Sequence, residues 1–344
     1  MIDLEQKIDY LKYYDQEEIS IMEVCGSHTG AIAKLGIQGM LSSKIHLVSG
    51  PGCPVCVTIS AYIDQLIELA QKENCCIVTF GDLLRVPGSK KSLSMAKGEG
   101  ARVEMVYSPL DILKLAAKEK DTQFIFAAVG FETTTPVYAL LLEELIGGDI
   151  QNVRLLTALK TMPPVIDQLC QKGASIQGFL APGHVCVVTG SDRFKELSKR
   201  YQIPFGVSGF EGEEILTALY GIVKARGRAE VMNFYPSVVT QNGNEKAKQM
   251  VDTYFEAGDA AWRGMGNIAG SGLYLRKEYE RFDAGSRGLV EDIKINKACC
   301  CDKVLVGAIR PEECPLFGKV CTPLTPQGAC MVSTEGSCAA HFAN

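Results

Sequence analysis

The sequence predicts an α/β fold with two similar domains, in which parallel sheets are flanked by helices, and a coil-rich cysteine region at the C-terminus. Short apolar runs alternate with amphipathic stretches over most of the chain, which is typical of sheets covered by helices on both faces. The chain has 344 residues, 47% of them hydrophobic, enough for two or three packed domains. From about residue 285 the periodicity stops and Cys, Pro and Gly become frequent. Such a segment usually needs a metal or another cross-link to hold its shape.

The individual elements follow from the spacing of apolar side chains. Compact apolar runs predict strands at 19–24, 44–49, 75–80, 102–107, 123–129, 152–159, 176–181 and 203–208. Amphipathic stretches predict helices at 3–14, 29–36, 58–73, 109–119, after Thr134, and at 163–172, 191–200 and 211–225. The regular strand–helix alternation therefore covers most of the chain before residue 240.

This order of elements divides the chain into four parts. Residues 1–44 form an N-terminal segment that we expect to pack with the C-terminal region, and 45–150 form a first α/β domain. Residues 151–240 form a second α/β domain, and 241–344 form the C-terminal region. Gly-Phe-Glu follows a predicted strand in both α/β domains, which is as compatible with chance as with duplication.

Composition excludes several classes of protein. The net charge of −5 gives no basic footprint for nucleic acid. No run approaches the roughly 18 apolar residues that a membrane helix needs, and the charged N-terminus does not have the pattern of a signal peptide. We therefore expect a cytoplasmic location. In that reducing compartment the 14 cysteines favour metal or redox chemistry over a disulfide framework.

Polar residues follow the ends of several predicted strands. They are Cys25, Cys53, Cys56, Asp82, Glu132, His184 and Glu211. In open parallel sheets that edge binds ligands, so we expect these side chains to share a site. Glu132 and Glu211 also suit a role at a helix N-terminus alone, and His184 suits a buried structural histidine.

Cys25 lies three residues before His28, in "CGSHT", where a predicted helix begins. A helix N-terminus lowers the pKa of a nearby thiol, which would make Cys25 available as a ligand or nucleophile. His28 could orient the thiolate or be a second ligand. The alternative is a capping Ser27 with a surface histidine.

Cys53 and Cys56 form the C-x-x-C motif of "GPGCPVC". The proline between them stiffens the loop, and the helix after Thr58 would stabilise a thiolate, as in redox-active motifs. Half of a zinc site is the structural alternative, with Cys25 and His28 as the second pair.

Half of the cysteines lie after residue 298. Cys314, Cys321, Cys330 and Cys338 supply four thiolates on a coil-rich segment, which suits either zinc or a 4Fe–4S cluster. Zinc ribbons favour two tight C-x-x-C pairs, and the spacing here is wide. The spacing therefore favours a cluster.

Taken together, "CGSHT", "GPGCPVC", "GFETTTP", "PGHV" and "CPLFGKVCTPLTPQGACMVSTEGSCAA" resemble the HypD family of nickel–iron hydrogenase maturation proteins, in order and over essentially the whole chain. The resemblance implies a scaffold that binds a small HypC-type chaperone and holds an iron that receives two cyanides and one carbon monoxide. A HypE-type protein would deliver the cyanide. It also implies a 4Fe–4S cluster and a redox-active dithiol.

The resemblance also implies roles for particular residues. Cys25 matches the iron-site cysteine, with His28 in the same motif, and Glu132 and His184 match residues that line the same cleft. Cys53 and Cys56 match the dithiol. The four cluster cysteines match Cys314, Cys321, Cys330 and Cys338.

The chain departs from the family pattern at three places. The segment before the cluster has "ACCCDK" where the family has Ala-Cys-x-Cys-Gly, Cys186 stands where serine is frequent, and the tail "AAHFAN" lacks tyrosines. The first departure leaves open whether Cys299 or Cys301 replaces one cluster ligand. Two other functions stay open as well: a stand-alone iron–sulfur thiol–disulfide oxidoreductase acting on a protein substrate, and a zinc-stapled structural protein.

Overall fold

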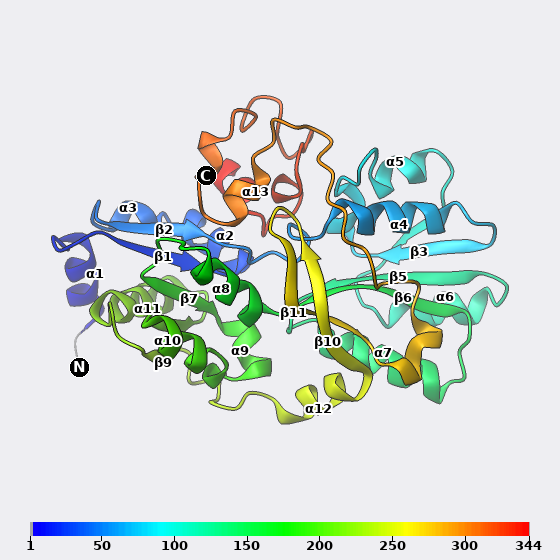
Figure 1. Ribbon diagram of the computed structural model, residues 1–344, viewed down its shortest axis with the longest axis horizontal. Helices are drawn as coiled ribbons and strands as arrows, with labels where there is room; N and C mark the ends of the chain where they lie inside the picture. The colour runs from blue at the N-terminus through cyan, green and yellow to red at the C-terminus, as the bar shows by residue number, and fades with distance from the viewer. Residues whose placement is uncertain (1–2, 344) are drawn as a thin grey trace.

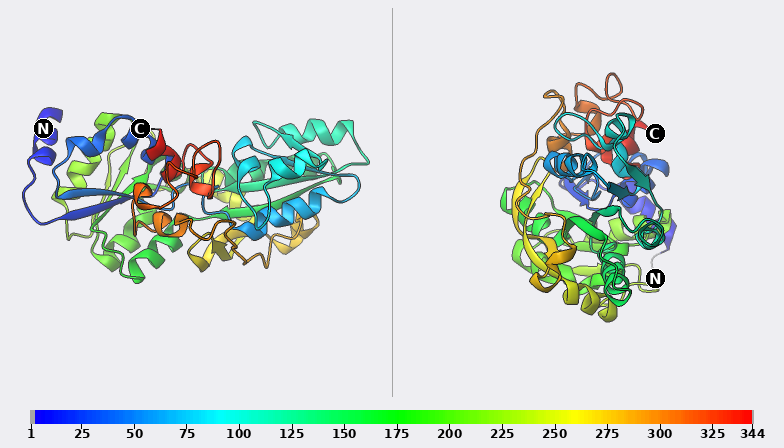
Figure 2. Two further views of the ribbon diagram at one scale, coloured as in Figure 1. Left: turned by 90° about the horizontal axis from the view of Figure 1, so that it is seen from above. Right: turned by 90° about the vertical axis from the view of Figure 1, so that its right-hand side faces the viewer.

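Two β-sheets lie next to each other along the long axis of the molecule in the computed structural model, which describes residues 3–343. Helices cover the sheets, and the C-terminal segment lies over the junction between them (Figure 1, Figure 2). The α/β class and the coil-rich cysteine region that the sequence predicts are therefore confirmed.

The first sheet has five strands, all parallel, in the order β2-β1-β7-β8-β9. Its strands are β1 (Ile19–Glu23), β2 (Ile45–Ser49), β7 (Gly178–Pro182), β8 (Phe205–Ser208) and β9 (Val231–Asn233). The helices of this half are α1 (Leu4–Lys12), α2 (Gly26–Lys34), α3 (Ile37–Met40), α9 (Gly183–Thr189), α10 (Lys195–Tyr201) and α11 (Gly212–Lys224). Numbered along the chain, the strands have the order 2-1-3-4-5, which is that of a doubly wound sheet.

The second sheet has six strands in the order β10-β11-β6-β5-β3-β4. Four are parallel: β3 (Cys75–Thr79), β4 (Val103–Met105), β5 (Gln123–Gly130) and β6 (Val153–Lys160). An antiparallel hairpin of β10 (Phe255–Trp262) and β11 (Gly266–Leu275) extends the sheet beside β6. The helices of this half are α4 (Ser60–Ala70), α5 (Leu93–Gly98), α6 (Asp111–Lys118), α7 (Thr135–Gly147) and α12 (Glu245–Tyr254). Helix α8 (Met162–Gln171) lies beside β7, packs into the core of the first sheet and also contacts β11 (Figure 1).

Every strand that the sequence predicts is present, but two of them belong to the other sheet. The strand at 44–49 was expected in the first α/β domain, yet β2 pairs with β1 in register Ile45 to Ile19. The strand at 152–159 was expected in the second, yet β6 pairs with β5. The sequence pattern does not predict the hairpin, whose residues were assigned to the C-terminal region and which extends the second sheet. Buried parallel strands are apolar along their whole length, so the pattern predicts that a strand exists but not its neighbours.

The repeated Gly-Phe-Glu does not mark equivalent places in the two sheets. Residues 130–132 begin at the last residue of β5, the third parallel strand of its sheet along the chain, whereas 209–211 follow β8, the fourth of its own. The structure therefore favours chance over duplication as the origin of this echo.

The C-terminal segment, residues 285–343, contains little regular structure. Its α-helices, α13 (Cys301–Leu305) and α14 (Ser337–Phe342), are short, and α14 packs on α2 at the edge of the first sheet. Across residues 3–343, no helix is both long enough and apolar enough to cross a lipid bilayer.

Candidate functional site

Three of the predicted site residues lie at the carboxyl edge of the first sheet, where the strand order reverses between β1 and β7. Cys25 follows β1 and is the N-cap of α2, which also carries His28. His184 lies in the first turn of α9, directly after β7. The sequence predicts a simple turn at His184, and the helix that replaces it has seven residues. The reversal point of a doubly wound sheet is where such folds bind ligands.

The two histidines pack on Phe210, which follows β8. The ring centroid of Phe210 lies 4.7 Å from that of His28 and 4.1 Å from that of His184. His28 is fully buried, and its Nε2 lies 2.8 Å from the carbonyl oxygen of Gly209. Since a carbonyl only accepts, Nε2 carries the proton and Nδ1 is left with a free lone pair. Burial lowers the pKa of His28 to about 4, so its ring is neutral.

Among the described residues, Nδ1 of His28 has no hydrogen-bond partner. A neutral imidazole whose other nitrogen is fixed by a backbone carbonyl is the usual state of a metal-binding histidine. Nδ1 of His28 is therefore available as a ligand for a metal ion. The alternative prediction of a surface histidine is wrong, because His28 is buried.

The thiol of Cys25 is buried, with 8% of the residue exposed. Burial raises its pKa to about 12, although the backbone N–H groups of His28 and Ser27 act in the opposite direction. The expectation of a lowered pKa at the helix N-terminus is therefore wrong for the unliganded protein, because loss of hydration outweighs the helix terminus. Such a thiol becomes a thiolate when it releases its proton on binding a metal.

Glu132 reaches this region from the second sheet, after the end of β5. Its Oε1 accepts the backbone N–H of Met162 at 2.8 Å, while its Oε2 has no partner within the described part of the chain. Burial raises the pKa of Glu132 to about 7, and the charge of Arg193 limits the rise. Glu132 thus brings an unpaired, buried carboxyl oxygen that can hold or release a proton near neutral pH.

Cys186, one of the departures from the family pattern, connects these groups. It is fully buried on α9, two residues after His184. Burial raises its pKa, and the negative charges of Glu132 and Cys25 add to the rise. Residues from the carboxyl edges of both sheets therefore share one electrostatic environment.

The other two predicted edge residues have structural roles. The side chain of Glu211 forms a reciprocal capping box with Glu214 at the start of α11. Asp82 accepts a hydrogen bond from Ser333 at 2.8 Å and so attaches the C-terminal segment to the second sheet. For Glu211 the helix-terminus interpretation is the right one.

The dithiol lies on the connection that leads from β2 to α4, between the two sheets. Cys53 and Cys56 are free thiols, 3% and 0% exposed, and the backbone N–H of Cys56 points at Cys53 Sγ at 3.2 Å. Cys56 Sγ contacts the carbonyl oxygen of Ala329 at 3.7 Å. Burial raises the pKa of Cys56, so the helix after Thr58 does not produce a stabilised thiolate here. The dithiol faces the C-terminal cysteines and not solvent.

The C-terminal cysteines surround one small apolar cavity. It is lined by Cys299, Cys301, Cys314, Cys321, Cys330 and Cys338, together with Val304, Phe317, Gly328 and Met331. Cys301 and Cys330 are joined as a disulfide, and the other four are free thiols. Within residues 3–343, no group of three or more His, Cys, Asp or Glu side chains is arranged to hold a single metal ion. A 4Fe–4S cluster needs four thiolates in apolar surroundings, and this cavity has four free thiols and two more when the disulfide is reduced, so the residues present fit such a group.

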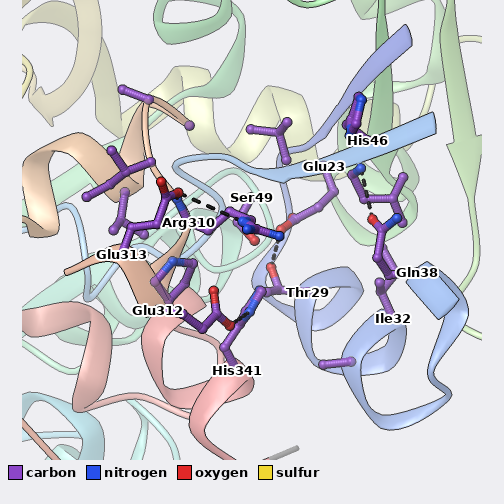
Figure 3. A pocket seen from close by; sticks show the side chains of 18 of the residues that line it. Glu23, Thr29, Ile32, Gln38, His46, Ser49, Arg310, Glu312, Glu313 and His341 are labelled. Carbon is purple, nitrogen blue, oxygen red and sulfur yellow. Dashed lines mark hydrogen bonds and ion pairs between the residues drawn. The ribbon is translucent and has the colours of Figure 1, made fainter. Parts of the chain in front are cut away.

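A pocket of about 650 Å³ opens beside Glu23 and Thr29, between the first sheet and the C-terminal segment (Figure 3). Glu23, at the end of β1, lines it together with His46 and Ser49 from β2. Its opposite wall carries Glu312 and His341, whose side chains meet at 2.6 Å.

Glu23 is the functional candidate that sequence reasoning missed. It is 3% exposed, its Oε2 accepts the backbone N–H of Cys25, and its Oε1 accepts the hydroxyl of Thr29. Burial raises its pKa to about 8. The available signal was an acidic residue inside the apolar run "ISIMEV", because a buried carboxyl group requires partners.

The chain is similar to known proteins over nearly its whole length. A family model described as "HypD: Hydrogenase formation hypA family" matches residues 2–344. A putative hydrogenase expression/formation protein of Methanocaldococcus jannaschii is 43% identical over 97% of this chain and 92% of its own length. Hydrogenase maturation factor HypD of Escherichia coli is 39% identical over 98% of this chain and 92% of its own length. HypD of Rhizobium leguminosarum bv. viciae is 41% identical, with coverage of 94% and 87%.

Proposed function

Because the chain belongs to the HypD family of hydrogenase maturation factors, we propose that it is the scaffold and redox protein on which the Fe(CN)2CO unit of nickel–iron hydrogenase is assembled. The observation that carries this proposal is that Cys25, His28 and Glu132 are buried around the junction of the two sheets, while the exposed His184 packs on Phe210 beside them. The iron is cargo in this proposal, held while it receives its diatomic ligands and then passed on.

The donor atoms suit this cargo. A low-spin iron that carries cyanide and carbon monoxide needs electron-rich, soft ligands, and a thiolate is such a ligand. Cys25 would supply the thiolate, and Nδ1 of His28 would supply a second lone pair or fix the orientation of an iron-bound group. Glu132, which acts on Cys186 as Cys25 does, has a pKa of about 7 and can hold or release a proton in this region.

Two partner proteins complete the proposal. Cys25 and His28 fill only part of the coordination sphere of an iron, and a transient cargo requires a protein that carries it away. We therefore assign a HypC-type chaperone as the second holder of the iron and a HypE-type protein as the donor of cyanide, in the cytoplasm.

The cysteine-lined cavity supports a redox role. Cys314, Cys321, Cys330 and Cys338 would hold a 4Fe–4S cluster once a thiol has reduced the Cys301–Cys330 disulfide, with Cys299 or Cys301 as alternatives to one of the four. The cluster would supply one-electron chemistry when bound. Cys53 and Cys56 supply a two-electron dithiol couple. Cys56 contacts Ala329, the neighbour of Cys330 in sequence, so the two kinds of sulfur chemistry are next to each other.

An infrared spectrum of the protein co-purified with its HypC-type partner tests the assembly function. Bands in the cyanide and carbonyl stretching regions are expected when the HypE-type protein is co-expressed, and the cyanide bands should disappear when it is left out. An iron-containing complex without such bands would contradict the proposal. If the chain alone reduces a disulfide substrate at full rate, it is instead a stand-alone oxidoreductase.

A further inference from the structure

The turn of the β10–β11 hairpin lies between the dithiol segment and the C-terminal cysteine region, and Figure 1 shows its tip reaching toward α13. Arg263, in this turn, forms hydrogen bonds with the two residues that follow Cys56. Its backbone N–H donates to the carbonyl oxygen of Val57 at 2.9 Å, and its Nε donates to that of Thr58 at 2.6 Å. Its Nη2 donates to the carbonyl oxygen of Pro87 at 3.1 Å.

The other side of Arg263 faces the cysteines. Arg263 lines a small cavity with Cys299, Cys301 and Gly328, and these three residues also line the cavity that six of the seven C-terminal cysteines surround. The guanidinium group therefore lies one residue layer behind the cysteine cavity. The turn fits closely here, since a Cβ atom on Gly264 would lie 2.4 Å from the Cβ of Asp302.

The charge of Arg263 is poorly compensated. The residue is 6% exposed, and Oδ1 of Asp292 lies 3.9 Å from Nε, beyond hydrogen-bond distance. The oxygens of Asp292 accept the backbone N–H groups of Ser60 and Gly264 instead. Lys294, the second cation of this cavity, is paired with Asp302 at 2.7 Å. A guanidinium keeps its proton in proteins, so Arg263 is a fixed, buried positive charge.

On the basis of the proposed cluster and dithiol, we propose that Arg263 is a positioning residue that holds the dithiol segment against the cysteine cavity and sets the electron affinity of that cavity. Uptake of one electron without a proton makes the cysteine-bound centre more negative by one charge. A buried cation nearby stabilises that product relative to the oxidised form, because charges interact strongly away from water.

Potentiometric titration of the purified partner complex, followed by electron paramagnetic resonance, tests this role. Arg263→Gln should weaken electron uptake at least tenfold, which is a potential lower by about 59 mV for a one-electron couple. Arg263→Lys should keep the potential within a threefold change in the equilibrium constant, because the charge remains. Asp292→Asn should shift the potential in the opposite direction, because it removes the carboxylate nearest to the guanidinium. Arg287→Gln, on the exposed side of the hairpin, is the control and should change nothing.

The variants of opposite sign keep the proposal testable even if Arg263→Gln does not fold. In that case the proposal is supported if Asp292→Asn raises the reduction potential while Arg263→Lys leaves it unchanged. An unchanged reduction potential in Asp292→Asn overturns the proposal. The rate of amide hydrogen exchange in residues 50–59 should rise in Arg263→Lys if the hydrogen bonds of Arg263 hold the dithiol segment in place. Wild-type protein with neither a cluster signal nor a cycling dithiol overturns the proposed redox function itself. Normal signals with unshifted potentials in every variant overturn only the role of Arg263.

Discussion

Glu23 accepts the backbone N–H of Cys25 through Oε2 at 3.2 Å, so a buried carboxyl group fixes the residue that we propose as the iron ligand. With a pKa of about 8, the carboxyl group is protonated at neutral pH. Oε2 then accepts from Cys25, and the protonated Oε1 donates to the Thr29 hydroxyl, whereas the ionised Oε1 accepts from it. A glutamine amide can likewise accept from Cys25 and donate to Thr29.

Glu23→Gln should therefore preserve the fold and change the pH dependence of stability. The pKa of Glu23 is raised on folding, so the stability it contributes is complete below about pH 4.5 and is lost as pH rises to about 8. Glutamine has no such loss. The variant should gain on the wild type by a few kcal/mol between pH 5 and pH 8, at about 1.4 kcal/mol per pKa unit.

Urea unfolding at pH 5, 6.5 and 8 measures this difference. Glu196→Gln, at an exposed side chain, is the matched control and should follow the wild type at each pH. A constant difference between Glu23→Gln and wild type at all three pH values would show that Glu23 ionises normally.

Cys25→Ala should abolish the cyanide and carbonyl bands of the partner complex while the cysteine-cavity chromophore remains. Loss of one buried thiol should cost about 1 to 2 kcal/mol of unfolding free energy, which leaves the protein folded. Cys170→Ala, a partly buried cysteine on α8, is the control and should keep the bands. Normal bands in Cys25→Ala would show that another residue holds the iron.

The ligand set of the proposed cluster can be separated by single substitutions. Cys314→Ala, Cys321→Ala, Cys330→Ala and Cys338→Ala should each remove most iron and acid-labile sulfide and loosen the C-terminal region, because metal binding and folding are coupled there. Cys299→Ala and Cys301→Ala should retain both. Iron and sulfide analysis with visible absorption decides the matter, and a larger loss in Cys299→Ala than in Cys330→Ala would replace Cys330 in the set.

Cys53 and Cys56 should switch together between thiol and disulfide. Samples equilibrated in graded thiol buffers, quenched in denaturant, alkylated and analysed by mass spectrometry should give one two-electron transition at about −200 to −270 mV. Serine at either position should stop maturation without changing cluster absorption. If both thiols stay alkylatable at every potential, or if stoichiometric zinc remains after purification, the relay does not exist.

The sequence was sufficient for eight strands, but not for β9, β10 and β11 and not for how the strands and the candidate site are arranged. "ISIMEV" and "CCIVTF" predict buried strands because their apolar runs leave few alternatives, and Cys25 and His184 follow strand ends as expected. The sequence could not predict that β2 pairs with β1 or that β6 pairs with β5, because an apolar strand can pair with many other apolar strands. The raised pKa of Cys25 was also out of reach, because it depends on side chains far away in sequence that bury the thiol.

The disulfide between Cys301 and Cys330 was missed for a different reason. Disulfides are rare in the reducing compartment expected for this chain. Whether one particular pair of cysteines comes close enough to form a disulfide depends on two loops that meet only in the folded chain.

The strands of the first sheet are separated in the chain by the parallel strands of the second sheet, which lie between β2 and β7. This order affects how the protein folds during synthesis on the ribosome. β1 and β2 emerge early, yet β7, the strand that covers the other edge of β1, follows only after residues 50–177 have been added. A two-stranded sheet is marginal in water and exposes an unpaired edge. The second sheet, whose parallel strands are continuous in the chain, can therefore form first, and the nascent protein folds from its middle outward. Cys53 and Cys56 leave the ribosome well before the C-terminal cysteines that later cover them, so during synthesis the dithiol is open to the oxidants and thiols of its surroundings.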